Sequence, residues 1–243
     1  AEGAYNRMLN LFRKCTLKNF LPKYKAYNDM IGYSLYAGEF SVAEEYVLKI
    51  QNYITENSFY NFPEKYKVIS NKILSDLFNN DINTKKAKII VKEGIEALKK
   101  YENQTGVSKV VKMNLACLYI LDSNYSEAEK RLFQLYSSMQ KYTNNLYSTC
   151  VHANLSALYL LKKDYTNALE FNLKVKEKLL NWDDNYKTYY IWQNEYMKSL
   201  IESGIEVTSF DLFKLDETHT TSAKTYKFIG RGLMFSELLF YTL

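Results

Sequence analysis

Two stretches of the chain, residues 114–128 and 154–168, align without a gap when one is shifted by 40 positions. Each begins with an asparagine and a leucine, continues with a small residue and a tyrosine, and ends with a second tyrosine and an alanine. Small residues let two antiparallel helices approach closely, and bulky leucine and tyrosine side chains fill the space between them. The repeat therefore predicts a recurring helical hairpin. The matching residues are Leu115, Ala116, Tyr119, Tyr125 and Ala128 in the first copy and Leu155, Ser156, Tyr159, Tyr165 and Ala168 in the second.

Short polar stretches separate the two helices of each predicted hairpin. Residues 122–124 and 162–164 have the composition of tight turns. Ser126 and Thr166 follow them and are predicted to cap the N-terminus of the second helix, since a hydroxyl can accept a backbone N–H there.

Weaker copies extend the pattern toward both ends of the chain. A further first helix is predicted at residues 186–203, ending near Gly204, and a leading helix at residues 4–20, closed by Pro22. Residues 1–204 are thus predicted to form one repeat domain of about five hairpins. Four alanines mark the same place in successive copies, at nearly equal intervals along the chain: Ala43, Ala87, Ala128 and Ala168.

This pattern resembles the tetratricopeptide repeat, which reads Leu-Gly-x-x-Tyr followed by Ala-x-x-x-Phe. Here Ala116 and Ser156 replace the glycine, while Leu132 and Asn172 replace the phenylalanine. The resemblance implies an all-α fold, a right-handed α-solenoid of antiparallel helical hairpins. The period of this chain is longer than that of the common tetratricopeptide repeat, which implies longer helices.

Composition favours helices as well. The 243 residues include 8 glycines and 2 prolines, fewer turn residues than the frequent chain reversals of a sheet protein require. The sequence therefore predicts no β-sheet.

The repeat pattern stops after Gly204, and residues 205–243 are predicted to form an irregular segment followed by a terminal helix. Residues 223–243 are apolar but carry charges, which excludes a membrane-spanning helix. We expect this segment to cap the open end of the solenoid. An alternative is a contact surface for another domain, built from Phe235, Leu238, Leu239 and Tyr241.

Charge and cysteine content indicate the class of partner and the cellular compartment of the protein. The formal net charge of +5 comes from scattered residues, which argues against binding nucleic acid through this segment. Cys15, Cys117 and Cys150 are odd in number and form no CxxC pair, as is typical of a reducing compartment. With no signal-peptide pattern and no long apolar run, we expect a cytoplasmic protein without membrane contact. The chain starts at Ala1 rather than at methionine, so we expect either a processed chain or a segment of a longer protein, which leaves room for an upstream effector domain.

The sequence offers no pattern of an enzyme. Two histidines, His152 and His219, have no metal-ligand spacing to the cysteines, and no glycine-rich phosphate loop occurs. Cys150 and His152 are two positions apart, so on a helix they point to different faces and cannot form a nucleophile–base pair. Burial of His152 as a packing residue is the simpler interpretation. The sequence predicts no catalysis, metal or cofactor.

One polar residue recurs at the same place in successive first helices. Asparagine lies at positions 71, 114, 154 and 194, although it is a poor interior helix residue. In peptide-binding tetratricopeptide proteins, which these helices resemble, an asparagine here faces the concave groove and binds the ligand backbone. The alternative is a solvated polar position without function. The predicted groove consists of Asn71, Asn114, Asn154, Asn194, Met113, Cys117, Cys150, Tyr190, Gln193 and Met197.

The resemblance implies a module that binds a protein or a peptide. Two bacterial families use similar long-period repeats as ligand sensors in signalling: peptide-pheromone receptors and the signal-transducing NTPases of antiviral (antiphage) defence. We expect a ligand-sensing part of a larger protein of this kind. The alternative is a structural scaffold or oligomerisation module.

Overall fold

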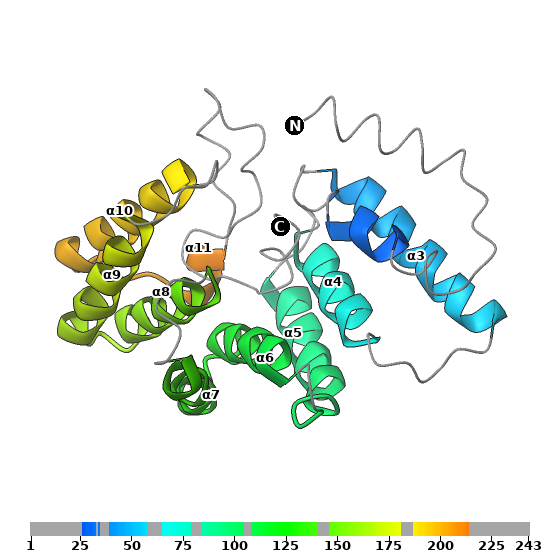
Figure 1. Cartoon of the computed structure of the whole chain (residues 1–243), viewed down its shortest axis with the longest axis horizontal. Helices are drawn as coiled ribbons and strands as arrows, with labels where there is room; N and C mark the ends of the chain where they lie inside the picture. Colours follow the sequence, from blue (N-terminus) through cyan, green and yellow to red (C-terminus); the bar gives the residue numbers. More distant parts are fainter. Residues whose placement is uncertain are drawn as a thin grey trace. The chain divides into compact units, whose positions relative to one another are not determined.

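The computed structural model describes residues 26–32, 34, 39–57, 65–78, 84–104, 108–139, 146–180 and 187–213. Throughout these residues the regular structure is α-helical, with no strand, which confirms the all-α prediction (Figure 1). The predicted leading helix at residues 4–20 and the predicted terminal helix at 223–243 lie outside the described residues. Besides a helical stretch at residues 26–32, the helices are α3 (Phe40–Glu56), α4 (Lys65–Phe78), α5 (Thr84–Lys99), α6 (Ser108–Leu121), α7 (Tyr125–Met139), α8 (Leu146–Leu161), α9 (Tyr165–Leu180), α10 (Lys187–Ser203) and α11 (Ser209–Phe213).

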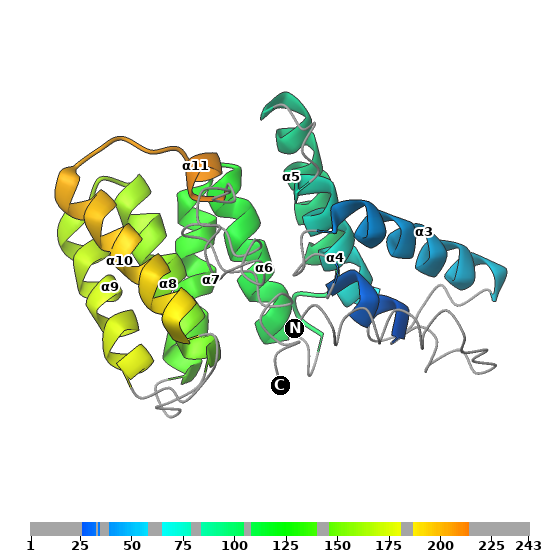
Figure 2. The same cartoon turned by 90° about the horizontal axis from the view of Figure 1, so that it is seen from above.

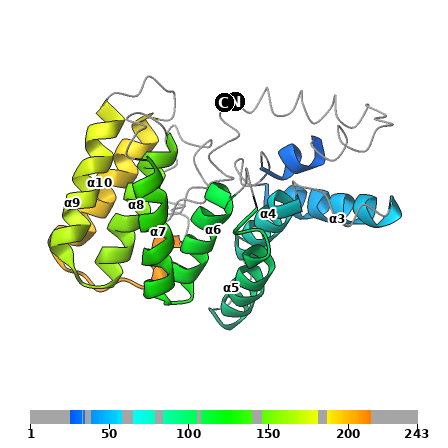
Figure 3. The same ribbon diagram turned by 60° about the horizontal axis from the view of Figure 1, so that its bottom comes forward.

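The described residues fall into two compact units that divide near residue 98. In the first unit, α3 and α4 pack side by side (Figure 3). Tyr27 from the preceding helical stretch contacts the rings of Tyr46 and Tyr53, with ring centroids 5.9 and 6.1 Å apart. Ala43 and Ala87, two of the recurring alanines, are buried.

The second unit contains the two strong copies of the repeat. Its helices α6 to α10 pack against one another in chain order (Figure 2), and the most extensive contacts join α6 to α7 and α8 to α9. Ala128 and Ala168 are buried, and the Ser156 hydroxyl donates to the Ala168 carbonyl over 2.9 Å. The small residues therefore lie where the hairpin helices cross, which confirms the predicted packing.

Both hairpins turn through the same backbone motif. Ser123 and Lys163 adopt the left-handed conformation, with φ of 59° and 61°. The next residue donates its N–H to a carbonyl five residues back in each case, Asn124 to Tyr119 (2.8 Å) and Asp164 to Tyr159 (2.9 Å). This is the Schellman arrangement, which satisfies the last carbonyls of a helix.

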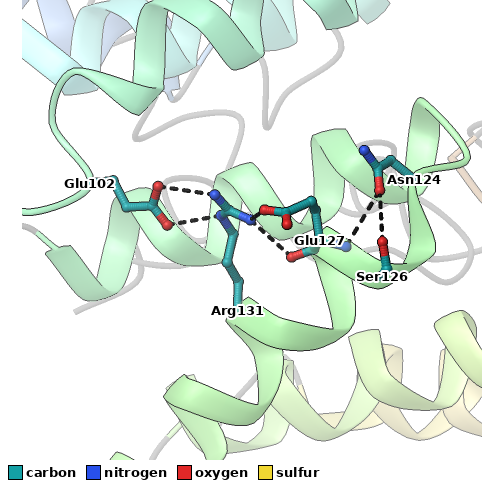
Figure 4. Close-up of polar contacts among 5 residues, drawn as sticks. All are labelled: Glu102, Asn124, Ser126, Glu127 and Arg131. Carbon is teal, nitrogen blue, oxygen red and sulfur yellow. Dashed lines mark hydrogen bonds and ion pairs between the residues drawn. The ribbon is translucent and has the colours of Figure 1, made fainter.

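The helix caps differ from the prediction. Asn124 Oδ1 accepts the Glu127 N–H at 3.4 Å and the Ser126 hydroxyl at 3.2 Å (Figure 4), and Asp164 Oδ1 accepts the Asn167 N–H at 3.2 Å. The prediction that Ser126 and Thr166 are the caps is therefore wrong by two residues. The reason is the turn, because one left-handed residue already ends the first helix and the next residue begins the second.

The third copy starts like the others but continues differently. α10 occupies the predicted range and is followed by Gly204, which has φ of 62° at the place of the earlier left-handed residues. The short helix α11 then packs on α6, where Ser209 donates to the Leu121 carbonyl over 3.4 Å and Leu212 is buried. The described residues after α10 thus return to the first hairpin of the unit, and none of them forms a second helix against α10.

Candidate functional site

The four asparagines of the predicted groove lie in the interior. The side chains of Asn71, Asn114, Asn154 and Asn194 are each at most 5% exposed. The alternative interpretation, a solvated polar position, is therefore wrong for these residues. Their predicted contact with a ligand stays a prediction, and it requires a ligand that reaches the interior.

A fifth asparagine belongs to the same series and was missed by the sequence analysis. Asn28 is buried, and its Oδ1 accepts a hydrogen bond from Asn71 Nδ2 over 3.0 Å in the first unit. Asn28 precedes Asn71 by the same interval that separates Asn71 from Asn114. The spacing was the available signal. In this pair, an asparagine links one first helix to the helical stretch before it.

Asn154 makes the corresponding link between α8 and α6. Its Nδ2 lies 3.1 Å from Met113 Sδ and 3.3 Å from Cys117 Sγ. These three side chains and Cys150 are fully buried. Burial, and secondarily the neighbouring Cys117, raises the pKa of the Cys150 thiol well above its ordinary value. The structure therefore brings four predicted site residues into one amide–sulfur cluster, in which the Cys150 thiol is neutral.

The remaining predicted site residues are also interior where they are described. Gln193 and Met197 of α10 are buried, and the side chain of Tyr190 lies outside the described residues. Asn172, which stands where the family pattern has phenylalanine, donates from Nδ2 to the Asn194 carbonyl over 2.9 Å. A polar contact between α9 and α10 thus replaces an aromatic one. Asn71 belongs to the first unit and is not grouped with the others.

Arg131 of α7 is the centre of a second polar cluster, which the sequence analysis did not identify (Figure 4). It is buried, and it binds Glu102 through Nε (2.8 Å) and Nη2 (3.0 Å) and Glu127 through Nη1. Its guanidinium lies over the Tyr119 ring, 4.5 Å from the centroid. The hydrogen bond from Arg131 lowers the pKa of the Glu127 carboxyl. The arginine therefore ties α7 to the turn before α6 and to α6 itself.

Phe171 of α9 occupies the position of Arg131 one repeat later. Its ring stacks on Tyr159 with centroids 5.7 Å apart and planes 2° from parallel. Tyr159 is the counterpart of Tyr119, so each hairpin keeps a flat group over the same tyrosine. In the first hairpin this planar group is a charged guanidinium. The signal that could have identified it is an arginine three residues after Ala128 and four residues after Glu127.

His152 packs among aromatic rings, as predicted. Its ring is edge-on to Tyr136 at 5.4 Å and lies 6.1 Å from Phe171. Burial, with the charges of Lys178 and Lys174, lowers the pKa of His152 to about 4, so the imidazole is neutral at pH 7. The histidine thus faces the second helices, while its sequence neighbour Cys150 interacts with Cys117.

Metal clusters and membrane-spanning helices do not occur among the described residues. No group of three or more histidine, cysteine or acidic side chains there is arranged to hold a metal ion. None of the described helices has the length and apolarity needed to cross a membrane. Comparisons with protein-family models, with curated proteins and with solved structures find no match for the chain.

Proposed function

We propose that this chain is a protein- or peptide-binding module, a right-handed α-solenoid of the tetratricopeptide type. The observation that carries the proposal is the repetition of one hairpin in α6–α7 and α8–α9, down to the left-handed turn residues Ser123 and Lys163. Stacked hairpins related by a constant step present an extended surface, and arrays of this kind serve mainly in binding. A surface held by regular packing loses little conformational entropy when a partner binds.

Because the asparagines are buried, the proposal assigns the ligand contacts to neighbouring positions of the first helices. Val110, one turn before Asn114, and Ala153, directly before Asn154, are both half-buried and reach the surface of the second unit. We propose that the ligand packs against these two positions. The asparagines then position the first helices rather than bind the ligand directly.

The long repeat period, which is similar to that of two families of bacterial sensor proteins, supports the wider role that we propose. In this role the module is the ligand-sensing part of a cytoplasmic signalling protein, either an antiphage NTPase or a peptide-pheromone receptor, with an effector domain upstream. The intact reading frame tests this directly, because an NTPase, nuclease or DNA-binding domain before Ala1 would define the pathway.

The binding role is tested with a partner captured from the organism that encodes the chain. Isothermal titration calorimetry would compare the wild type with Ala153→Glu, which puts a charge into the proposed contact surface. The matched control is Gln134→Glu, an exposed position on α7. We expect Ala153→Glu to weaken binding at least tenfold and the control to leave it unchanged. Equal affinities of both variants, with unchanged melting temperatures, would reject the groove as the binding face.

A structural scaffold is the second candidate function. The observation that favours it is a set of large apolar side chains exposed at the end of the second unit, Leu173, Leu180 and Ile191. Such residues commonly mark contact with another polypeptide.

A further inference from the structure

The first helices α6 and α8 of the second unit are buried almost all the way round. Each residue from Met113 to Leu121 is at most 4% exposed, although these consecutive helical residues point in all directions. No aspartate, glutamate, lysine or arginine occurs between Lys112 and Asp122 on α6, or anywhere in α8. A helix that is uncharged and apolar all round is typical of an enclosed position.

One side of each first helix is turned away from the second helices. On α8, Ser156 donates to α9 and Tyr159 stacks on Phe171, so these side chains face α9. Helical spacing turns Cys150 and Ala157 the other way, and the 40-residue repeat gives α6 and α10 the same register. We call the following residues the inner face: Val110, Met113, Cys117, Cys150, Ala153, Ala157, Gln193 and Met197.

The inner face is more buried than the described helices explain. Val110 and Ala153 are half-buried, and its other residues are buried. α7 and α9 lie on the opposite side, the first helices flank one another, and α11 packs on α6 beside its last residue, Leu121. α10 has no described helix beyond it, yet Gln193 and Met197 are 2% and 4% exposed. The burial therefore requires a further segment of the same chain over the inner face.

Residues 204–213 direct the chain toward this face. After α10 the chain passes the turn of the second hairpin, where Glu206 pairs with Lys163, and reaches the end of α6 (Figure 2). Leu212 is buried there, and Cys117 of the inner face lies one turn before Leu121 on α6. The described chain thus ends beside the inner face, with residues 214–243 still to follow.

The end of the sequence has the chemistry that an uncharged face selects. Residues 232–243 carry one charge, that of Glu237, and are otherwise mostly aliphatic or aromatic. The longest other stretch outside the described residues, 1–25, carries charges throughout. Burying those charges against the inner face without partners would be costly. Methionine side chains on the inner face adapt readily to an apolar segment.

We propose that residues 232–243 occupy the inner face of the second unit within the same chain, so that a partner must displace them. This inference rests on the proposed function, because Val110 and Ala153 of the inner face are the proposed ligand contacts. A tethered segment competes at an effective concentration on the order of millimolar, so it suppresses weak partners and leaves the face to tight ones.

A photo-crosslink on the full chain tests where the segment lies. Benzoylphenylalanine in place of Phe235 keeps an aromatic ring and inserts under light into nearby C–H bonds, preferentially those of methionine. We expect peptide mapping by mass spectrometry to find cross-links to Met113 or Met197. The same substitution at Tyr165, exposed at the start of α9, should give neither cross-link. Cross-links from position 235 that miss α6, α8 and α10 altogether would overturn the proposal.

A peptide experiment tests the competition. Leu238→Glu with Leu239→Glu should release the segment, and Thr220→Glu with Thr221→Glu is the control that adds the same charge outside it. We expect a fluorescent peptide of residues 230–243 to bind the released variant at least tenfold more tightly than the wild type or the control, by fluorescence anisotropy. Adding Ala153→Glu to the released variant should weaken peptide binding at least tenfold.

The outcomes separate this inference from the proposed function, since neither test uses an external partner. Equal peptide binding by the wild type and the released variant, with equal melting temperatures, would overturn the contact within the chain and leave partner binding standing. A captured partner that binds neither protein would reject the proposed function alone. Should the released variant fail to fold, the cross-link at position 235 still decides, because that substitution is conservative.

Discussion

Replacing Arg131 by alanine should destabilise the second unit strongly, because this arginine holds two carboxylates and one aromatic ring at once. Removing it leaves Glu102 without its ion-pair partner, which lies 2.8 Å away through Nε and donates a hydrogen bond of 3.0 Å from Nη2 in the wild type. It also uncovers the face of the Tyr119 ring, over which the guanidinium lies. The turn before α6 and the helix α7 would lose their shared contact.

The loss of stability in Arg131→Ala depends on how exposed the remaining partners of the arginine are to water. Removing one member of a buried ion pair costs about 3–5 kcal/mol, because the remaining charge is uncompensated. The Glu102 side chain is 16% exposed, so water reaches it in part, and the lower end of this range applies. Loss of the ring contact adds about 0.5–1 kcal/mol. We therefore expect Arg131→Ala to lower the free energy of unfolding by about 3–4 kcal/mol.

The second repeat suggests a compensating variant. Phe171 replaces the arginine there and stacks on Tyr159. Arg131→Phe combined with Glu102→Gln should restore the stacking and remove the unpaired charge, and we expect it to recover more than half of the loss caused by Arg131→Ala.

Urea unfolding followed by far-ultraviolet circular dichroism would compare the wild type, Arg131→Ala, Glu102→Gln and the double variant. Wild-type stability of Arg131→Ala would refute the reasoning about the buried ion pair. A double variant no more stable than Arg131→Ala would refute the equivalence of Arg131 and Phe171.

Three further predictions concern the turn, the pH dependence and the interior. Lys163→Gly should raise the free energy of unfolding by about 0.5–1 kcal/mol, because glycine adopts a φ of 61° without the steric cost of a side chain. Urea denaturation measures this change. A loss of stability would contradict the prediction. The pKa of His152 is lowered from 6.5 to about 4, so the unfolded chain binds a proton first as the pH falls. Stability should therefore decline between about pH 6.5 and 4, by up to about 3 kcal/mol, and a His152→Phe variant titrated in parallel should lack this component; parallel pH profiles would refute it. Asn154→Ala should destabilise by about 1–3 kcal/mol, because the amide is buried against Met113 and Cys117; an unchanged melting temperature would instead favour the sequence-based expectation of an open groove.

The hairpins could be predicted from the sequence because their determinants are local and repeated. Ala128 and Ala168 identify the helix crossings, and the polar stretches between the apolar runs set the helix length. Spacing also gives the register of the asparagines correctly, and it would have identified Asn28. The burial of these residues could not be predicted, since it depends on how closely the next first helix approaches.

Features that depend on distant partners were not predictable. The charge of Arg131 is compensated by Glu102, which lies 29 residues earlier, in a turn that nothing in the local sequence relates to α7. Ser123 and Lys163 adopt the left-handed conformation but are not glycines. Their residue types therefore did not predict the left-handed turns, which shift the helix caps by two residues. The sequence predicted that the repeat pattern ends after Gly204, but it did not predict that α11 packs on α6.

The contact between α11 and α6 affects how the second unit comes apart. In an open array of hairpins, contacts are local, and the ends can unravel one repeat at a time. The hydrogen bond from Ser209 to Leu121 spans 88 residues and connects the last described helix to the first helix of the same unit. Fraying of α10 therefore affects the helix with which the sequence of this unit begins. Loop-closure entropy slows the formation of such a contact, and once it has formed the intervening hairpins are held as one cooperative block.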